Sequence, residues 1–194
     1  MSNLLNNWAA DCNYEQMAHE KINAKLYSQL YASGWTIETV HDKERQKQGI
    51  DVILTSPDGL FHAYIDEKAR EKNDTHTFGL ELSNNYEWNN NKRTPGWFTD
   101  ETKVTTHYMF YYREGRDEYA MLIDVRNLKE KIYSIVDRNS LLNPMWGDNM
   151  LSLAINNDIE NAFIYESKKQ QEHGRFLVLP LDFYRSICIK EWKL

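Results

Sequence analysis

The sequence predicts an α/β protein whose central mixed β-sheet is flanked by helices. An amphipathic helical pattern near the N-terminus is followed directly by three short strand patterns, and strands and helices are mixed along the remainder. With 194 residues, of which 41% are hydrophobic and 13% aromatic, the chain has enough apolar surface for a sizeable core. We expect a single domain over 1–194, with its core motifs at 14–83 and additional strands and helices at 104–194.

The first predicted element is a helix over 14–32, which Gly34 closes as a C-terminal signal. Apolar residues recur there every four positions, at Tyr14, Ala18, Ile22, Leu26 and Leu30. A strand pattern at 35–41, a charged loop at 42–48 and strands at 50–55 and 60–69 follow. Further strands are predicted at 78–83, 106–114, 118–125 and 175–183, helices at 126–136 and 158–170, and an Asn-rich surface loop at 84–97.

Charge and composition restrict the class of protein. The net charge of -6 argues against a protein that coats nucleic acid by bulk electrostatics, but it is compatible with an enzyme that gathers carboxylates at its centre. Cys12 and Cys188 lie far apart and suggest neither a zinc site nor a disulfide framework. The start has no secretory leader pattern, and no run of about 18 apolar residues occurs, so we expect a cytoplasmic protein without membrane contact.

The stretch 49–69, GIDVILTSPDGLFHAYIDEKA, predicts a hairpin with an aspartate at the end of each strand. A two-residue Asp58-Gly59 turn places Pro57 opposite Leu60 and, continuing the pairing, Asp51 opposite Asp66. Two facing carboxylates repel unless a cation lies between them. Asp58 is predicted to be a turn residue only, because eight strand residues put it roughly 25 Å from Asp66.

Strand alternation places His62, Tyr64, Asp66 and Lys68 on one face of the second strand. Asp66 and Lys68 thus supply a carboxylate to bind metal and an ammonium to position or deprotonate water. Mg²⁺ prefers one or two carboxylates with water and phosphate oxygens, and Mn²⁺ can substitute for it. We therefore predict a metal site formed by Asp51, Asp66 and the backbone carbonyl of Glu67, with Lys68 beside the attacking water.

The residues GID at 49–51 and DEK at 66–68 resemble the motif of the PD-(D/E)XK nuclease superfamily. Asp51 matches its first acid, Asp66 its second acid and Lys68 its lysine. The resemblance implies a restriction-endonuclease-like core, which consists of a helix, a three-strand meander, a helix and a further strand. It also implies a Mg²⁺-dependent endo- or exodeoxyribonuclease. Ile50 stands where the family often has proline, and the second acid is Asp rather than Glu.

Two further carboxylates are candidate auxiliary metal ligands. Some members of the superfamily supply a glutamate from the first helix, and Glu15 lies near the centre of the apolar stripe of this helix. The alternative is a frayed helix start that leaves Glu15 in water. Glu81 lies on the polar side of the strand predicted at 78–83, and ordinary solvent exposure is its alternative role.

Basic and aromatic residues near these motifs form a candidate nucleic-acid track. Its named contacts are Lys47, Arg70, Lys92, Arg93 and Lys103, with Lys43, Arg45, Lys72, Trp88, Trp97 and Tyr108 in the same segments. Acidic residues are interleaved with these bases, so a solvated surface is the alternative.

The sequence thus predicts a metal-dependent nuclease acting on DNA. Two alternatives remain open: a ribonuclease of the same fold, and a catalytically inactive binding module of that fold. Homodimers are common in the superfamily, so the resemblance leaves both a monomer and a homodimer open.

Overall fold

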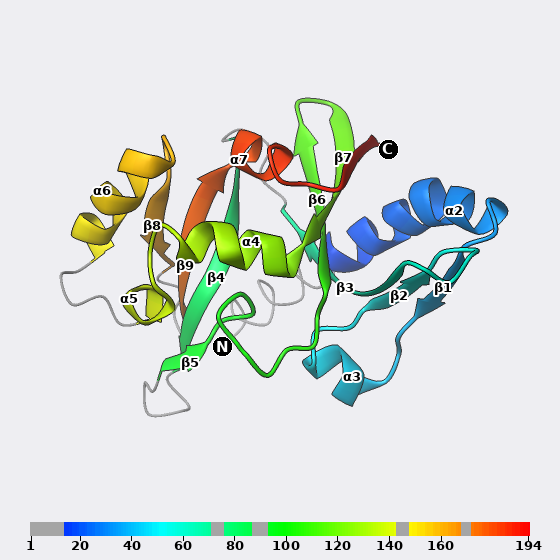
Figure 1. Cartoon of the computed structure of the whole chain (residues 1–194), viewed down its shortest axis with the longest axis horizontal. Coiled ribbons are helices and arrows are strands. Elements are labelled where there is room, and N and C mark those ends of the chain that lie inside the picture. Colours follow the sequence, from blue (N-terminus) through cyan, green and yellow to red (C-terminus); the bar gives the residue numbers. More distant parts are fainter. Residues whose placement is uncertain (1–13, 71–75, 87–92, 143–147, 168–171) are drawn as a thin grey trace, which may run out of the picture. The chain divides into compact units, whose positions relative to one another are not determined.

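The computed structural model describes residues 14–70, 76–86, 93–142, 148–167 and 172–194 (Figure 1). Their contacts divide the chain into two compact units. The first contains the chain up to 75, 103–126 and 188–194, and the second contains 76–102 and 127–187. Each unit has a β-sheet of its own. The single domain expected over 1–194 stays a prediction.

A helix over 14–32 begins the described part of the first unit, as predicted. Its middle is a π-helical turn, η1 (Asn23–Tyr27), and its last turn is α2 (Ser28–Ala32). The backbone N–H of Gly34 donates to the carbonyl of Tyr31 at 2.9 Å, and Gly34 has a φ of 86°. Glycine adopts this left-handed conformation without steric cost, which explains why the helix ends there.

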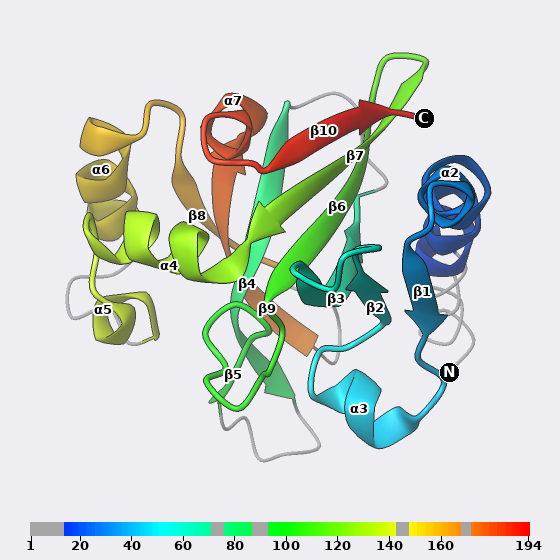
Figure 2. The ribbon, with the colours of Figure 1, turned by 45° about the vertical axis from the view of Figure 1, so that its right-hand side comes forward.

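The first unit contains a six-stranded sheet of order β1-β2-β3-β6-β7-β10 (Figure 2). Its strands are β1 (Thr36–Thr39), β2 (Val52–Thr55), β3 (His62–Ala69), β6 (His107–Glu114), β7 (Asp117–Asp124) and β10 (Lys190–Lys193). The pair β3 and β6 is parallel, and every other neighbouring pair is antiparallel. The sheet is therefore mixed, and the predicted α/β class is confirmed.

The helix lies along β1, β2 and β3 and buries its apolar stripe against this sheet (Figure 1). Ala18, Ile22 and Leu26 are buried with alternate residues of β2, β3, β6 and β7. Each large aliphatic side chain removed from water in this way stabilises the fold by about 1.5–3 kcal/mol. The strand residues in this core are Val52, Leu54, Ala63, Ile65, Met109, Tyr111, Ala120 and Leu122.

The β2–β3 hairpin has the predicted register. Val52 pairs with Ile65, and Thr55 pairs with His62. The turn differs from the predicted two-residue Asp58-Gly59 turn, because the N–H of Gly59 donates to the carbonyl of Ser56 at 2.9 Å and places Pro57 and Asp58 at its centre. The register is kept because the N–H of Ser56 donates to the carbonyl of Phe61 at 2.9 Å. Asp58 is exposed, and its carboxylate accepts hydrogen bonds from Ser56 Oγ and the N–H of Leu60. Asp58 is thus a turn residue, as expected.

Two elements of the first unit differ from the prediction. Strand β10 was not expected. The charged segment 42–48 is not a loop, because it contains the short helix α3 (Lys43–Lys47). The Asp42 carboxylate caps this helix by accepting the N–H of Arg45 at 2.8 Å, and Lys47 pairs with Glu44 one turn away. An aspartate before a charged segment is an N-cap signal, and here it outweighs the loop-like composition.

The described part of the second unit contains a four-stranded sheet of order β5-β4-β9-β8 and four short helices. Its strands are β4 (Thr77–Tyr86), β5 (Arg93–Pro95), β8 (Phe163–Glu166) and β9 (Glu172–Pro180), and neighbouring strands are antiparallel. Its helices are α4, α5 (Arg138–Leu142), α6 (Asp148–Asp158) and α7 (Leu181–Arg185). Helix α4 (Val125–Tyr133) begins at the end of the first unit and confirms the predicted helix near 126–136.

Three predictions for the second unit were wrong in part. The segment 158–170 contains strand β8 instead of a helix, because Phe163 and Tyr165 pair with β9. Residues 84–86 and 93–95 of the expected Asn-rich loop are strand, since Asn84 pairs with Thr94. The strand expected at 175–183 ends at Pro180, where helix α7 begins.

Among the described residues, no helix is both long enough and apolar enough to cross a membrane.

Candidate metal and phosphate site

Asp51 and Asp66 lie at the same end of the β2–β3 hairpin, each one residue beyond the last regular pair, Val52 and Ile65. The backbone N–H of Asp51 donates to the carbonyl of Ile65 at 2.8 Å. The N–H of Glu67 donates to Asp51 Oδ2, also at 2.8 Å. The local register therefore brings the two acids together, as predicted.

Lys68 joins this pair from the same strand. Its ammonium lies 2.5 Å from Asp66 Oδ1, and their side chains are 21% and 5% exposed. Burial lowers the pKa of Lys68, but the negative charges of Asp66 and Asp51 outweigh it, and the net shift is upward. Lys68 is therefore an ammonium at neutral pH, which favours the predicted role of positioning water over that of deprotonating it.

The charge of Asp51 is costly in this environment. Burial, and then the nearby charge of Asp66, raise the pKa of Asp51 to about 7. Lys68 and the N–H of Glu67 act in the opposite direction and offset only part of this shift. When Asp51 and Asp66 are both ionised, the single ammonium of Lys68 balances only one of the two negative charges. A bound cation would therefore stabilise the ionised form of the pair.

The backbone of 49–51 is fixed by a close approach. Gly49 has a φ of 80°, and a Cβ at this position would lie 2.2 Å from Thr105 Oγ1 and 3.5 Å from Asp66 Oδ2. Thr105 Oγ1 donates to the carbonyl of Gly49 at 2.7 Å. A glycine is thus required where the chain turns into the first acid of the motif.

The side chain of Glu67 points toward the first helix. Glu67 Oε2 lies 2.6 Å from His19 Nδ1, and Oε1 accepts the hydroxyl of Tyr27 at 2.7 Å. The carboxylate is engaged with the helix, so only the backbone carbonyl of Glu67 stays a candidate metal ligand. His19 and Tyr27 were not among the predicted site residues, although His19 follows Ala18 of the apolar stripe and its position on the helix could have suggested it.

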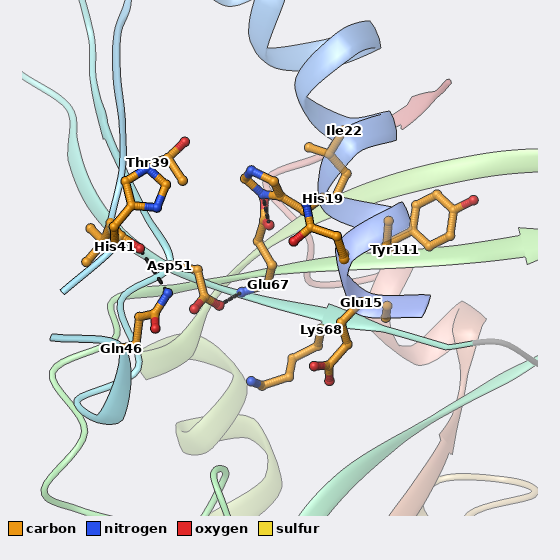
Figure 3. Close-up of a pocket in the computed structure, with 14 residues that line it drawn as sticks. Glu15, His19, Ile22, Thr39, His41, Gln46, Asp51, Glu67, Lys68 and Tyr111 are labelled. Atoms are coloured by element: carbon orange, nitrogen blue, oxygen red, sulfur yellow. Dashed lines mark hydrogen bonds and ion pairs between the residues drawn. The ribbon is translucent and has the colours of Figure 1, made fainter. Parts of the chain in front are cut away.

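A pocket of about 310 Å³ opens beside these residues. Asp51, Glu67 and Lys68 contribute to its wall from the hairpin, and Glu15 and His19 contribute from the helix (Figure 3). Its other walls come from β1, α3 and β6 and include Thr39, His41, Gln46 and Tyr111. The pocket thus brings Asp51 and Lys68 of the motif together with polar side chains that lie elsewhere in the sequence.

The two auxiliary carboxylates have different positions. Glu15 is exposed at this pocket, and its charge contributes to raising the pKa of Lys68. Glu81 belongs to the second unit, where it accepts the side-chain amide of Asn84 at 2.5 Å and the N–H of Trp97 at 3.1 Å. The role of Glu81 within its own unit is therefore to hold the segment that follows β5.

The described residues of the predicted nucleic-acid track belong to both units. Lys47 is exposed and paired with Glu44, and Lys103 donates to the carbonyl of Lys47. Arg70 lies just beyond β3, and its carbonyl accepts the hydroxyl of Tyr14. Arg93 belongs to the second unit and lies 3.4 Å from Glu166.

Other residues in the segments of this track have partners within the protein. Tyr108 is buried and stacks on Phe110, so it is not a surface contact. Arg45 pairs with Glu38 at 3.0 Å. Lys92, Lys72 and Trp88 lie outside the described residues.

The donor set fits a hard divalent cation better than a soft one. Within the described ranges, no group of three or more His, Cys, Asp or Glu residues is arranged to hold a metal ion. Asp51 and Asp66 instead form a pair of carboxylates next to a polar pocket. Mg²⁺ commonly uses one or two carboxylates and completes its shell with water and phosphate oxygens, so this pair is a sufficient protein contribution.

Comparison with known proteins gives no relative. No protein family, no curated protein and no solved structure matches this chain.

Proposed function

We propose that this protein is a Mg²⁺-dependent nuclease that hydrolyses phosphodiester bonds in DNA. The observation that carries the proposal is the meeting of Asp51, Asp66 and Lys68 at one end of the β2–β3 hairpin. This arrangement has the residue types and the strand placement of the PD-(D/E)XK motif.

The order of elements in the first unit supports a restriction-endonuclease-like core. A helix over 14–32 precedes the antiparallel meander β1, β2 and β3, and β6 then pairs parallel with β3. The family places a helix between the third and the next strand, whereas this chain has β4 and β5 at that point of the sequence. The proposal therefore concerns the helix, the meander and the parallel strand, which together position the acids.

The residues fit the metal because their charges are unbalanced without it. Asp51 and Asp66 would hold Mg²⁺ with their carboxylates, and the backbone carbonyl of Glu67 is a candidate third ligand. Glu15 is placed at the pocket to act through a water molecule. When bound, Mg²⁺ would polarise a phosphodiester and favour ionisation of a water molecule.

The chain's own residues would orient the reactants. The Lys68 ammonium, held by Asp66, can donate a hydrogen bond to the attacking water or to a phosphate oxygen. Asp51 is fixed by the N–H of Glu67, so its carboxylate keeps one orientation. The pocket beside these groups leaves room for the phosphate.

The test is a cleavage assay with labelled single-stranded and duplex DNA and RNA, in Mg²⁺, Mn²⁺ or EDTA. The wild type is compared with an Asp66→Ala, Lys68→Ala double variant and with Asp58→Asn as a control in the same hairpin. We expect metal-dependent cleavage of DNA that the double variant loses and the control keeps. Cleavage of RNA alone would identify a ribonuclease, and a folded wild type that cleaves nothing would favour the binding module.

A further inference from the structure

A row of three polar side chains connects the first helix to strand β3. Tyr27 Oη donates to Glu67 Oε1 at 2.7 Å. Glu67 Oε2 lies 2.6 Å from His19 Nδ1 (Figure 3). The row begins at a fully buried phenol and ends at an imidazole in the pocket wall. It is absent from the three-residue motif, and the proposed chemistry of Asp51, Asp66 and Lys68 does not use it.

The row determines which atom of His19 is available. Both oxygens of Glu67 are engaged, one by Tyr27 and the other by His19. Within the described part of the chain, the His19 ring has one hydrogen-bond partner, Glu67, which occupies Nδ1. The ring is 21% exposed and contributes to the pocket wall, so Nε2 is the atom left for a ligand.

The same pocket contains two further side chains that can donate to a phosphate, beside the carboxylates of Glu15 and Asp51. Lys68 contributes to its wall from β3, and the exposed His41 contributes from the segment after β1. An imidazole whose Nδ1–H is bound by a carboxylate presents Nε2 in one fixed direction, and its cation is stabilised when an anion approaches. Such an arrangement lowers the entropy cost of binding, because the ring does not need to be ordered by the ligand.

We propose that His19 binds a phosphate of the nucleic-acid strand in this pocket, and that Glu67 and Tyr27 are positioning residues for its ring. This inference rests on the proposed nuclease function. It assigns to the helix a phosphate contact that is separate from the metal-binding carboxylates of the hairpin. The occupant is a backbone phosphate of DNA, recognised by charge and hydrogen bonding and not by base sequence.

The test is fluorescence anisotropy with a short, labelled, single-stranded phosphorothioate DNA in EDTA at several salt concentrations. We expect His19→Gln to weaken binding at least about fivefold and to reduce the slope of log Kd against log salt by about one. The control is His62→Gln, because His62 is an exposed histidine of the same hairpin that contacts Thr55 and lies outside the pocket. This control should bind as the wild type does.

Two conservative variants separate positioning from folding. Glu67→Gln and Tyr27→Phe preserve side-chain size, and each should weaken DNA binding by less than His19→Gln does. Equal affinity and equal salt slope for His19→Gln and His62→Gln would overturn the inference. A wild type that does not bind this DNA would overturn it as well.

A Mn²⁺ titration by calorimetry distinguishes this inference from the proposed function. His19→Gln should bind Mn²⁺ with wild-type affinity, because the direct metal ligands are on the hairpin and Glu15, on the helix, would act only through a water molecule. Loss of Mn²⁺ binding in His19→Gln would mean that the helix supports the metal site instead of the phosphate, which contradicts the inference alone. Failure of the wild type to bind Mn²⁺ would refute the metal-dependent function, whatever His19 does.

Discussion

Asp51 and Asp66 face each other across the end of one hairpin, and burial together with the charge of Asp66 raises the pKa of Asp51 to about 7. An aspartate in an unfolded chain has a pKa of about 3.9, so the folded protein holds this proton more tightly than the unfolded chain does. Ionisation of Asp51 is therefore unfavourable for the stability of the metal-free protein at neutral pH.

Asp51→Asn should make the metal-free protein more stable at high pH. Because the folded pKa of Asp51 exceeds its unfolded value, the stability that this residue contributes is complete below about pH 4 and is lost as the pH rises to about 7. Removing the charge should recover about 1–3 kcal/mol at pH 8 in EDTA. Urea unfolding of both proteins at pH 5 and pH 8 measures this difference, and parallel losses of stability in the two proteins would contradict it.

Lys68→Met should destabilise the metal-free protein, and the loss of stability should be larger at pH 8 than at pH 5. The substitution removes the Lys68 ammonium, which balances one of the two negative charges of Asp51 and Asp66. Because Lys68 is partly exposed, we expect a loss of about 2 kcal/mol at pH 8 in EDTA, and a smaller loss at pH 5, where Asp51 is protonated. Thermal unfolding at the two pH values tests this, and an equal loss at both would show that packing and not charge explains the effect.

The hairpin is the part of the site that could be predicted from the sequence. Its Pro-Asp-Gly turn signal and its alternation of side chains are local, so they predict the register that brings Asp51 and Asp66 together, although the turn has Pro57 and Asp58 at its centre instead of Asp58 and Gly59. The first helix was also predictable, since its apolar stripe and Gly34 lie within one segment.

Contacts between distant segments were not predictable in the same way. The pairing of β4 with β9 joins Thr77 to Pro180, and no local pattern specifies it. The contact between His19 and Glu67 likewise depends on how the helix lies on the sheet. Helix α3 and strand β8 differ from the prediction for another reason, because their local signals, an N-cap aspartate and a short apolar run, are weak beside the charged and polar composition around them.

Gly49→Ala should damage both the fold and the metal site. The new Cβ would have to displace Thr105 Oγ1 and would contact Asp66 Oδ2. Gly59→Ala is the matched control, because Gly59 also has a positive φ, of 70°, but has no atom within 4 Å of the position that a Cβ would occupy. We expect a cost of about 1 kcal/mol for the control and of about 3 kcal/mol for Gly49→Ala. Denaturant unfolding measures the free-energy cost of each variant. Equal costs would contradict the close approach of Thr105 Oγ1 to Gly49.

Arg175→Met should destabilise the second unit. Arg175 is 1% exposed, its Nε donates to Asp148 Oδ1 at 2.8 Å, and its Nη1 donates to the carbonyl of Leu141. Truncation leaves a carboxylate and a carbonyl without this donor, for a loss of about 3 kcal/mol. Arg93→Met removes a 3.4 Å surface pair with Glu166 and should change stability by less than about 0.5 kcal/mol. Unfolding curves that shift equally for the two variants would refute the structural role of Arg175.

Calorimetric titration of Mn²⁺ into the wild type, Asp66→Asn and Asp58→Asn tests the metal site most directly. Asp58 and Asp66 belong to the same hairpin, but Asp58 is exposed at the turn and Asp66 is buried beside Lys68. We predict that one Mn²⁺ binds to the wild type and to Asp58→Asn with the same affinity, and that Asp66→Asn binds it at least about tenfold more weakly. Unchanged Mn²⁺ binding in Asp66→Asn, or no binding to the wild type, would contradict the assignment of Asp51 and Asp66 as metal ligands.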